Sequence, residues 1–368
     1  MTNQLSAGKK LLVAPLDWGL GHATRCIPVV KTLVANGCEV VLAASGPQAA
    51  LLREAFPALE IIDLAGYGIV YSRRGGWWKI VSQLPKIAAA IRHEHQWLAR
   101  LLQQRHFDAV ISDNRYGLYT RHCRTVLITH QLQPALPAGW DWSLPLARRL
   151  FHRLIARFDE CWIPDVADPK QGLSGELGHP EMMPSTHCRY VGWLTRFEPV
   201  ATEPAAEPFV LALLSGPEPQ RTVLEEKIAG QLANETMPVV LVRGLPQDAS
   251  TLQLPLPHQA FNHLDSAALQ KAMQQAAFVI CRGGYSTLMD AFTLQKKLIM
   301  IPTLGQTEQQ YLAQKLAANG TVIAVNQENF QLASIISAAE KKAFQIPAVP
   351  PNQLQQSVHA WLQILTTS

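Results

Sequence analysis

Three side chains that can give or take a proton follow apolar runs in the first half of the sequence. His22 ends a glycine-rich segment, and Asp113 and His130 each come directly after a run typical of a short buried strand. The carboxyl ends of neighbouring parallel strands share one edge of a sheet, so we expect Asp113 and His130 to converge on His22. An imidazole and a carboxylate at such an edge are groups that act as general bases.

Apolar runs of this kind alternate with helical patterns along the chain, which predicts parallel sheets with helices on their faces. In the first half, the expected strands are 10–15, 39–44, 60–64, 107–112, 125–128 and finally 161–165, and the expected helices are 23–36, 51–55, 80–104 and 144–158. Residues 172–188 are irregular and are expected to carry a small hairpin. In the second half, the expected strands are 209–214, 238–243, 278–281, 298–301 and 322–325, and the expected helices are 223–233, 267–277 and 353–365.

The opening strand, glycine-rich loop and helix have the order found in a dinucleotide-binding unit. Such a site uses the pattern G-x-G-x-x-G and an acidic residue at the end of the second strand. Gly19 and Gly21 supply only the first half of the glycine pattern, and residues 44–46 carry no carboxylate. The sequence therefore disfavours NAD binding.

The segment 277–311 predicts a second ligand-binding unit. The buried strand 278–281 runs into Gly283 and Gly284, which make a tight turn that glycine adopts without steric cost. Ser286 and Thr287 are expected to cap the helix that follows. This arrangement places backbone N–H groups and the positive end of a helix dipole at the carboxyl end of a strand, where a diphosphate binds.

The residues around this turn also resemble a known signature. Residues 282–290 (RGGYSTLMD), the pair 301–302 (IP) and residues 308–311 (EQQY) together resemble the donor site of GT-B glycosyltransferases. The similarity is to the MurG-like (family 28) and UDP-glucuronosyltransferase-like enzymes. It covers both halves of the chain, most specifically 279–320 and more loosely 11–36. It implies two Rossmann-like, doubly wound domains that face each other across a cleft.

The resemblance also implies which residues bind a nucleotide sugar. The acidic residue at Asp290, here one methylene shorter than the usual Glu, bonds the ribose hydroxyls, and Gln309 and Gln310 reach the sugar. Phosphate-binding loops are expected after the first strand of each domain, with Arg221 adding a charge, and the nucleobase is expected near His263. The full implied donor site is Gly19, Gly21, Ser215, Gly216, Arg221, His263, Leu264, Arg282, Gly283, Gly284, Ser286, Thr287, Asp290, Glu308, Gln309 and Gln310.

The same resemblance gives the proton-exchanging residues an order of preference. The glycine-rich loop that ends at His22 is similar to the first loop of the MurG-like N-terminal domain, which makes His22 a general base or a phosphate contact. His22 ranks first as the base, then Asp113, then His130. The alternatives are that His22 is bonded only to backbone at a helix start, that Asp113 is a turn carboxylate, or that each residue orients another.

The length of 368 residues suggests two domains, and 48% hydrophobic residues suffice for two cores. We expect an N-terminal acceptor-binding domain at 1–197, a linker at 198–208, and a nucleotide-sugar-binding domain at 209–345. Residues 346–368 should form a helix that packs back on the N-terminal domain. Six cysteines are scattered singly without a C-x-x-C pair, as is typical of reduced core residues.

The formal charge of +4 is unevenly distributed. Residues 1–199 hold 22 Lys and Arg against 16 Asp and Glu, and residues 200–368 hold 10 against 12. A basic first half suits an anionic acceptor or a membrane surface but is too mild for a nucleic-acid binder. No apolar run approaches the length of a transmembrane helix, which is about 20 residues.

The segment Arg73–Lys79 has two arginines, two glycines and two tryptophans within seven residues. Tryptophan beside basic residues suits the interface of a membrane, where aromatic rings lie at headgroup level and cations meet anionic lipid. The alternative, to which we give equal weight, is that Trp77 and Trp78 pack beneath their own loop.

The resemblance implies an inverting, metal-independent glycosyltransferase that moves a sugar from a UDP-sugar to an acceptor hydroxyl. It leaves open whether the acceptor is lipid-linked. No cofactor is expected beyond the donor substrate. One alternative is a UDP-sugar epimerase or hydrolase of the same fold, and another is a non-catalytic sugar-nucleotide-binding protein. We expect a cytoplasmic protein, with any membrane contact at the inner face of the plasma membrane.

Overall fold

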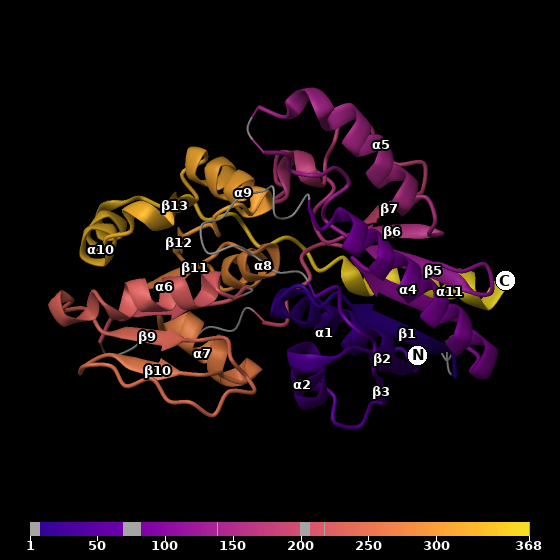
Figure 1. Ribbon diagram of the computed structural model, residues 1–368, viewed down its shortest axis with the longest axis horizontal. Helices are drawn as coiled ribbons and strands as arrows, with labels where there is room; N and C mark the ends of the chain where they lie inside the picture. The colour runs from indigo at the N-terminus through magenta and orange to yellow at the C-terminus, as the bar shows by residue number, and fades with distance from the viewer. Residues whose placement is uncertain (1–7, 69–81, 138, 199–206, 217, 368) are drawn as a thin grey trace. The chain divides into compact units, whose positions relative to one another are not determined.

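The computed structural model describes residues 8–68, 82–137, 139–198, 207–216 and 218–367. These residues divide into two units, one made of 8–68, 82–194 and 350–367 and the other of 195–349. In Figure 1 the yellow helix α11 (Leu354–Thr367) lies among indigo and magenta elements, because the end of the chain belongs to the first unit.

The first unit is built on a seven-stranded parallel sheet with the order β3-β2-β1-β4-β5-β6-β7. Its strands are β1 (Lys10–Pro15), β2 (Glu39–Ala43), β3 (Ile61–Ile62), β4 (Ala109–Asp113), β5 (Arg124–Ile128), β6 (Glu160–Ile163) and β7 (His187–Tyr190). Its helices are α1 (Leu20–Ala35), α2 (Gly46–Ala55), α4 (Leu84–Gln104), α5 (Leu144–Ile155) and α11, with 3-10 turns η1 (Asp141–Ser143) and η2 (Gly175–Leu177).

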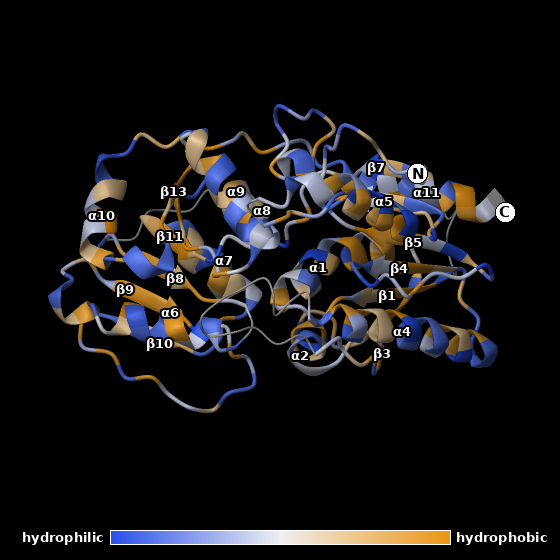
Figure 2. Cartoon of the chain, turned by 45° about the horizontal axis from the view of Figure 1, so that its top comes forward, coloured by the Kyte–Doolittle hydropathy of each residue, from blue (hydrophilic) through white to orange (hydrophobic). Residues whose placement is uncertain are grey.

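Both faces of this sheet are covered, as the nearly continuous apolar strands require. Leu98 of α4 packs in one cluster with Leu12 and Val41 of the central strands. Trp361 of α11 meets Trp162 of β6 edge to face, with ring centroids 5.3 Å apart. Figure 2 shows the central strands as the most hydrophobic part of the unit.

The prediction that 161–165 is the last strand of the first domain is wrong. The strand β7 pairs with β6 in parallel and lies at the sheet edge. Its residues, His-Cys-Arg-Tyr, are exposed or half-buried, so the sequence carries no apolar run to reveal it. The expected hairpin in 172–188 is also wrong, since that segment holds the turn η2 and then enters β7.

The second unit has a six-stranded parallel sheet with the order β10-β9-β8-β11-β12-β13. Its strands are β8 (Val210–Leu213), β9 (Val239–Val242), β10 (Gln259–Phe261), β11 (Phe278–Cys281), β12 (Leu298–Met300) and β13 (Val322–Ala324). Its helices are α6 (Gln220–Ala229), α7 (Ser266–Gln275), α8 (Tyr285–Thr293), α9 (Thr307–Ala318) and α10 (Leu332–Lys341), with 3-10 turns η3 (Leu232–Asn234) and η4 (Gln327–Asn329).

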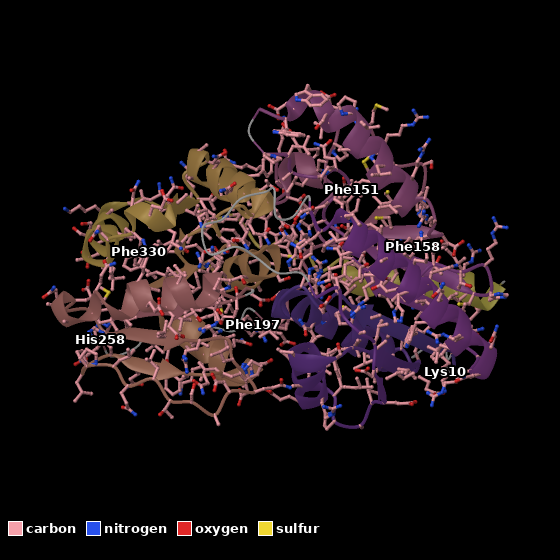
Figure 3. All side chains as sticks on the ribbon, in the orientation of Figure 1. Lys10, Phe151, Phe158, Phe197, His258 and Phe330 are labelled. Atoms are coloured by element: carbon pink, nitrogen blue, oxygen red, sulfur yellow. The ribbon has the colours of Figure 1, made fainter. Side chains whose placement is uncertain are left out.

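The core of the second unit joins strand residues such as Val210 and Ile280 to Leu224 of α6 and Ile336 of α10. Phe330 belongs to this core and Phe158 to a core of the first unit, and both are labelled among the side chains of Figure 3. In each sheet the strand order reverses next to the unit's first strand, which confirms the predicted doubly wound class. No described helix is both long enough and apolar enough to cross a membrane.

Candidate active site

The strand order of the first unit creates a ligand crevice between β1 and β4. The chain continues from β1 toward one side of the sheet and from β4 toward the other. The loops that follow the carboxyl ends of these two strands therefore diverge. Pro15, the last residue of β1, pairs with Asp113, the last residue of β4. His22 lies in the first turn of α1, directly after β1. The topology therefore brings His22 and Asp113 to one rim.

The three predicted proton-exchanging residues lie together around one arginine. The Nδ1 atom of His22 is 2.7 Å from Oδ1 of Asp113. The Arg25 guanidinium donates to both carboxylate oxygens of Asp113, and its Nη1 lies 3.2 Å from Nδ1 of His130. Arg25 and Asp113 are fully buried, whereas 15% of the His22 side chain is exposed. His22 is therefore the member of this cluster that reaches the surface of the unit.

The charge of Asp113 determines which ring nitrogen of His22 carries the proton. Burial alone would raise the pKa of Asp113, but the charges and hydrogen bonds of Arg25 and His22 outweigh it and lower that pKa to about 2. An ionised carboxylate only accepts hydrogen bonds, so Nδ1 of His22 donates to it. The lone pair of the imidazole is then on Nε2, the tautomer that a general base requires.

Arg25 is the residue of this cluster that the sequence analysis missed. It lies three residues after His22 on α1, so both side chains project from the same face of the helix. Its signal is a single arginine in the otherwise apolar stretch from Ala23 to Val30. Arginine is rarely fully buried unless it is paired, so such a residue in a core helix indicates a buried carboxylate partner.

The first glycine-rich loop is held by side chains of its own unit. Gly19, with φ of 84°, precedes α1, and Gly21 lies in its first turn. Gln48 donates to the backbone oxygens of Asp17 and Gly19, and the Asp17 carboxylate accepts from the backbone N–H of Tyr67. These contacts fix the position from which α1 presents His22.

The strand order of the second unit creates the equivalent crevice between β8 and β11. Ser215 and Gly216 follow β8, and Gly283 and Gly284 follow β11. The helix α8 begins at Tyr285, and its N-cap residue, Gly284, has no side chain to cap the first turn. The predicted capping role of Ser286 and Thr287 is therefore wrong, because both lie within the helix.

The two glycines of this turn differ in what the fold demands of them. Gly283 has a φ of 74°, and a Cβ there would lie 2.2 Å from Cε of Met300. Gly284 has a φ of −61°, and a Cβ there would meet nothing within 4 Å. The fold therefore requires glycine at Gly283 only. A glycine that the fold does not require, at the start of a helix, leaves room for a ligand to approach the backbone.

Arg282 differs from its predicted role as a donor-binding residue. Its guanidinium is buried and donates to the backbone oxygens of Gln220 and Ile301 and to the side chain of Gln327. Burial lowers its pKa to about 10. Arg282 thus ties together the loops that follow β8, β12 and β13, beneath the turn of Gly283 and Gly284.

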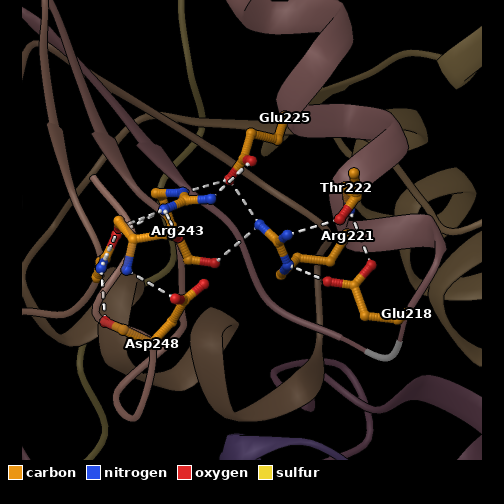
Figure 4. A network of polar contacts seen from close by, with 8 residues as sticks. Glu218, Arg221, Thr222, Glu225, Arg243 and Asp248 are labelled. Atoms are coloured by element: carbon orange, nitrogen blue, oxygen red, sulfur yellow. Dashed lines mark hydrogen bonds and ion pairs between the residues drawn. The ribbon is translucent and has the colours of Figure 1, made fainter. Parts of the chain in front are cut away.

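Arg221 is also turned away from its predicted role as a phosphate contact. Figure 4 shows its guanidinium between Glu218 and Glu225, at 2.5 Å and 2.6 Å. Glu225 is shared with Arg243, which also donates to the side chain of Asn262. This network braces the loops after β8, β9 and β10, and the pairing of Arg221 with two carboxylates corrects the prediction.

The carboxylate of Asp290, which the sequence analysis expected to bond ribose hydroxyls, is bonded to residues of its own unit. Asp290 is buried, and its carboxylate accepts from Oγ1 of Thr195 at 2.8 Å, with Nε of Arg196 at 3.5 Å. Burial raises the pKa of Asp290, and the Arg196 charge and the Thr195 hydrogen bond oppose that rise without cancelling it. In this structure Asp290 holds the first residues of the second unit to α8.

The other predicted donor residues lie on loops and helix starts of the second unit. His263 and Leu264 lie between β10 and α7, and Glu308, Gln309 and Gln310 lie in the first part of α9. Oε1 of Gln309 accepts from the backbone N–H of Thr303, which closes the loop before α9. Among the described residues, no group of three or more His, Cys, Asp or Glu side chains is placed to hold a metal ion.

Comparison with known proteins agrees with this geometry. Residues 222–359 match the family model described as the glycosyltransferase family 28 C-terminal domain. An uncharacterised glycosyltransferase of Methanosarcina acetivorans is 22% identical over 82% of this chain and 81% of its own length.

Solved structures with this fold include Acinetobacter baumannii MurG, with a TM-score of 0.55 and 15% identity over 97% of this chain and 99% of that one. Arabidopsis thaliana UGT89C1, complexed with UDP-L-rhamnose, has a TM-score of 0.60 and 12% identity over 97% of this chain and 99% of that one.

The two parallel sheets and these structural neighbours define the GT-B fold, as the sequence analysis predicted. With the family 28 domain model over its second half, the chain is a glycosyltransferase of the GT-B type.

Proposed function

We propose that this protein transfers a sugar from a UDP-sugar to an acceptor hydroxyl with inversion at the anomeric carbon. The observation that carries the chemistry is the cluster of His22, Asp113 and Arg25 in the first unit. The donor assignment is supported by the open space beside Gly284 at the start of α8 and by the neighbour that was solved with UDP-L-rhamnose.

In the proposed reaction, Nε2 of His22 takes the proton of the acceptor hydroxyl as its oxygen attacks the anomeric carbon. The bond from that carbon to the diphosphate oxygen breaks, and UDP leaves with the electron pair and its negative charge. The imidazolium that forms is stabilised by the ionised Asp113 that accepts from its Nδ1. General base catalysis of this kind contributes about 10²- to 10⁴-fold.

Arg25 acts on this reaction as a positioning residue. Its two bonds to Asp113 fix the carboxylate, and the carboxylate in turn fixes the ring orientation and tautomer of His22. Arg25 also keeps Asp113 ionised, because burial without a cation would favour the neutral acid. His130 contacts Arg25 and contributes to the same alignment.

The leaving diphosphate is stabilised, in this proposal, by backbone N–H groups and the dipole at the start of α8 rather than by a metal ion. Gly284 lets the diphosphate approach that backbone closely. Ser215 and Gly216 lie at the other side of the same strand-end crevice, and Arg282 and Arg221 hold the surrounding loops.

The acceptor and the location of the protein stay predictions. The segment Arg73–Lys79, which the sequence analysis assigned to membrane contact, lies outside the described residues. We keep the hypothesis of an acceptor at the membrane, with the protein on the cytoplasmic side.

A thermal-shift panel of nucleotides in EDTA-containing buffer tests the donor assignment. A nucleotide at 100 times its Kd stabilises a protein by about 2.7 kcal/mol, so UDP should raise the Tm clearly. Gly284→Ala fits the described backbone, because a Cβ there meets nothing within 4 Å, so its Tm without ligand should stay near that of the wild type. The variant should lose the response to UDP, because the added side chain blocks the diphosphate.

Turnover assays separate the remaining possibilities. His22→Ala should bind UDP as the wild type does and lose transfer to the acceptor. UDP release without an acceptor, or a sugar epimerised at carbon 2, would assign the protein to the epimerase or hydrolase class. Stabilisation by a nucleotide other than UDP would overturn the donor, and binding without any turnover would leave a sugar-nucleotide-binding protein.

A further inference from the structure

Large apolar side chains are exposed together on one surface of the first unit. Trp142 is 76% exposed, Leu146 is 73% exposed and Leu150 is 58% exposed, although such residues are normally buried. Met182 and Met183 are also exposed, and the Arg148 guanidinium of α5 lies 3.4 Å from the sulfur of Met182. We call Trp142, Leu146 and Leu150, with the exposed arginines of α5, the α5 surface.

The helix α5 exposes its leucines and arginines on the same side. Leu146 and Leu150 are four residues apart and lie one above the other, and the exposed Arg149 and Arg153 are their direct neighbours. Ile155, at the end of the helix, is fully buried and anchors α5 to its unit. The helix, labelled at the top of Figure 1, thus turns an apolar stripe outward and places positive charge along it.

The charge of this surface selects among possible occupants. Residues 144–158 contain four arginines and no acidic residue, and the carboxylates beside them in sequence are those of Asp141, Asp159 and the buried Glu160. The core of a protein–protein interface is depleted of charge, whereas here arginines are interleaved with leucines. Leucine and tryptophan flanked by arginine are instead typical of a helix that lies in the interface of an anionic bilayer.

The length of α5 suits a helix that lies in the bilayer interface and does not cross the bilayer. Twelve residues make a helix of about 18 Å, too short to span a bilayer. Lying flat, the helix inserts the leucines and Trp142 between lipid tails and headgroups, while the arginine stems extend so that their guanidinium groups reach lipid phosphates. Stacking of Trp140 on Trp142, with ring centroids 5.8 Å apart, presents a broad aromatic edge beside the helix.

We propose that the α5 surface docks the protein on a bilayer that contains anionic phospholipid. This inference assigns a membrane contact to a helix for which the sequence analysis proposed no function. It stands on exposure and charge alone, so it does not depend on the transfer reaction proposed above.

Vesicle co-sedimentation of the full chain tests this surface. Wild-type protein should sediment with phosphatidylcholine vesicles that contain phosphatidylglycerol and not with phosphatidylcholine alone, and high salt should weaken the binding. The double variant Leu146→Glu/Leu150→Glu should bind at least about tenfold more weakly, because it removes apolar area and adds negative charge. Arg149→Gln should weaken binding about fivefold, the expected effect of one charge near the surface.

A control is Val34→Glu, which adds one negative charge at an exposed apolar residue of α1 in the same unit. It should bind vesicles as the wild type does, and circular dichroism should show that all variants are folded. Equal binding by the double variant and the wild type would overturn the proposal. So would a wild-type dimer that the double variant converts to a monomer while vesicles bind neither, because the surface would then join two copies of this chain.

Discussion

Two buried carboxylates that each contact an arginine, Asp113 in the first unit and Asp290 in the second, have pKa values shifted in opposite directions. Asp113 receives two bonds from Arg25 and one from His22, and its pKa falls to about 2. Asp290 is also buried but receives one hydroxyl bond, one backbone N–H and a more distant guanidinium at 3.5 Å, and its pKa is raised. The number and directness of the cationic contacts decides in which direction each pKa moves.

This difference separates a group suited to chemistry from a group that holds backbone. An ionised Asp113 stabilises a positive imidazolium beside it, which is what a base that has taken a proton requires. Asp290, whose pKa is raised by burial, instead ties Thr195 and Arg196 to α8. The sequence analysis had given the ligand-binding role to Asp290 and only second rank to Asp113.

The largest expected difference between the two carboxylates is in kcat, when each is replaced by the uncharged Asn. Asp113→Asn should lower kcat for sugar transfer about 10²- to 10⁴-fold, because the amide no longer fixes the reactive tautomer of His22. Asp290→Asn should leave kcat within a few-fold of the wild type. Steady-state kinetics with folded variants measures both, and equal losses would break the comparison.

The arginines that contact the two carboxylates should differ in how much they contribute to the stability of the protein. Arg25→Met leaves a buried charge without its cation, which costs about 3 to 5 kcal/mol. Arg196→Met should cost about 1 kcal/mol, since its contact is longer and the pKa of Asp290 is raised rather than lowered. Urea unfolding followed by tryptophan fluorescence compares them; a larger loss for Arg196→Met would contradict the ranking.

The two carboxylates should contribute to the pH dependence of folding stability with opposite signs. The folded pKa of Asp113 is depressed, so its stabilisation of about 2 kcal/mol is present above pH 4 and is lost as the pH falls from about 4 to 2. The folded pKa of Asp290 is raised, so its contribution is greatest below pH 4 and is lost as the pH rises through the folded pKa.

Urea midpoints between pH 2 and pH 7 measure these two dependences, with the Asn variants as controls. The acid-labile part should vanish in Asp113→Asn, and the part lost on raising the pH should vanish in Asp290→Asn. An unchanged profile in Asp113→Asn would show that its carboxylate is not the group responsible.

The smallest effect should come from the hydroxyl that contacts Asp290. Thr195→Val keeps the side-chain shape and removes the donor, at a cost of about 1 kcal/mol. Thr125→Val, where the hydroxyl bonds Asp159 on the first unit, is a control for losing one hydroxyl bond to a carboxylate. Thermal unfolding distinguishes the two, because only Thr195→Val should alter the pH dependence due to Asp290.

The sequence predicted the parts of this fold that depend on local pattern. The strand 278–281, the glycine turn and the convergence of Asp113 with His22 follow from apolar runs and from the geometry of parallel strands. The edge strand β7 was missed because its side chains are polar and only half-buried.

The partners of buried charges were not readable from the sequence. Arg221, Arg282 and Asp290 have side chains of the right type for a donor site, but each is bonded within the second unit. Which carboxylate an arginine meets depends on tertiary packing between residues far apart in the chain. Arg25 is the counterexample, since its position three residues after His22 on an apolar helix is a local signal.

The place of α11 has a consequence for the order in which the chain folds. The described residues of the second unit are all made before Trp361, the residue that covers Trp162 in the first unit. During synthesis the second unit can complete its core while the first still lacks its final helix. A nascent or truncated chain without residues 350–368 would therefore carry one finished unit and one with an uncovered tryptophan, a form that chaperones and proteases recognise.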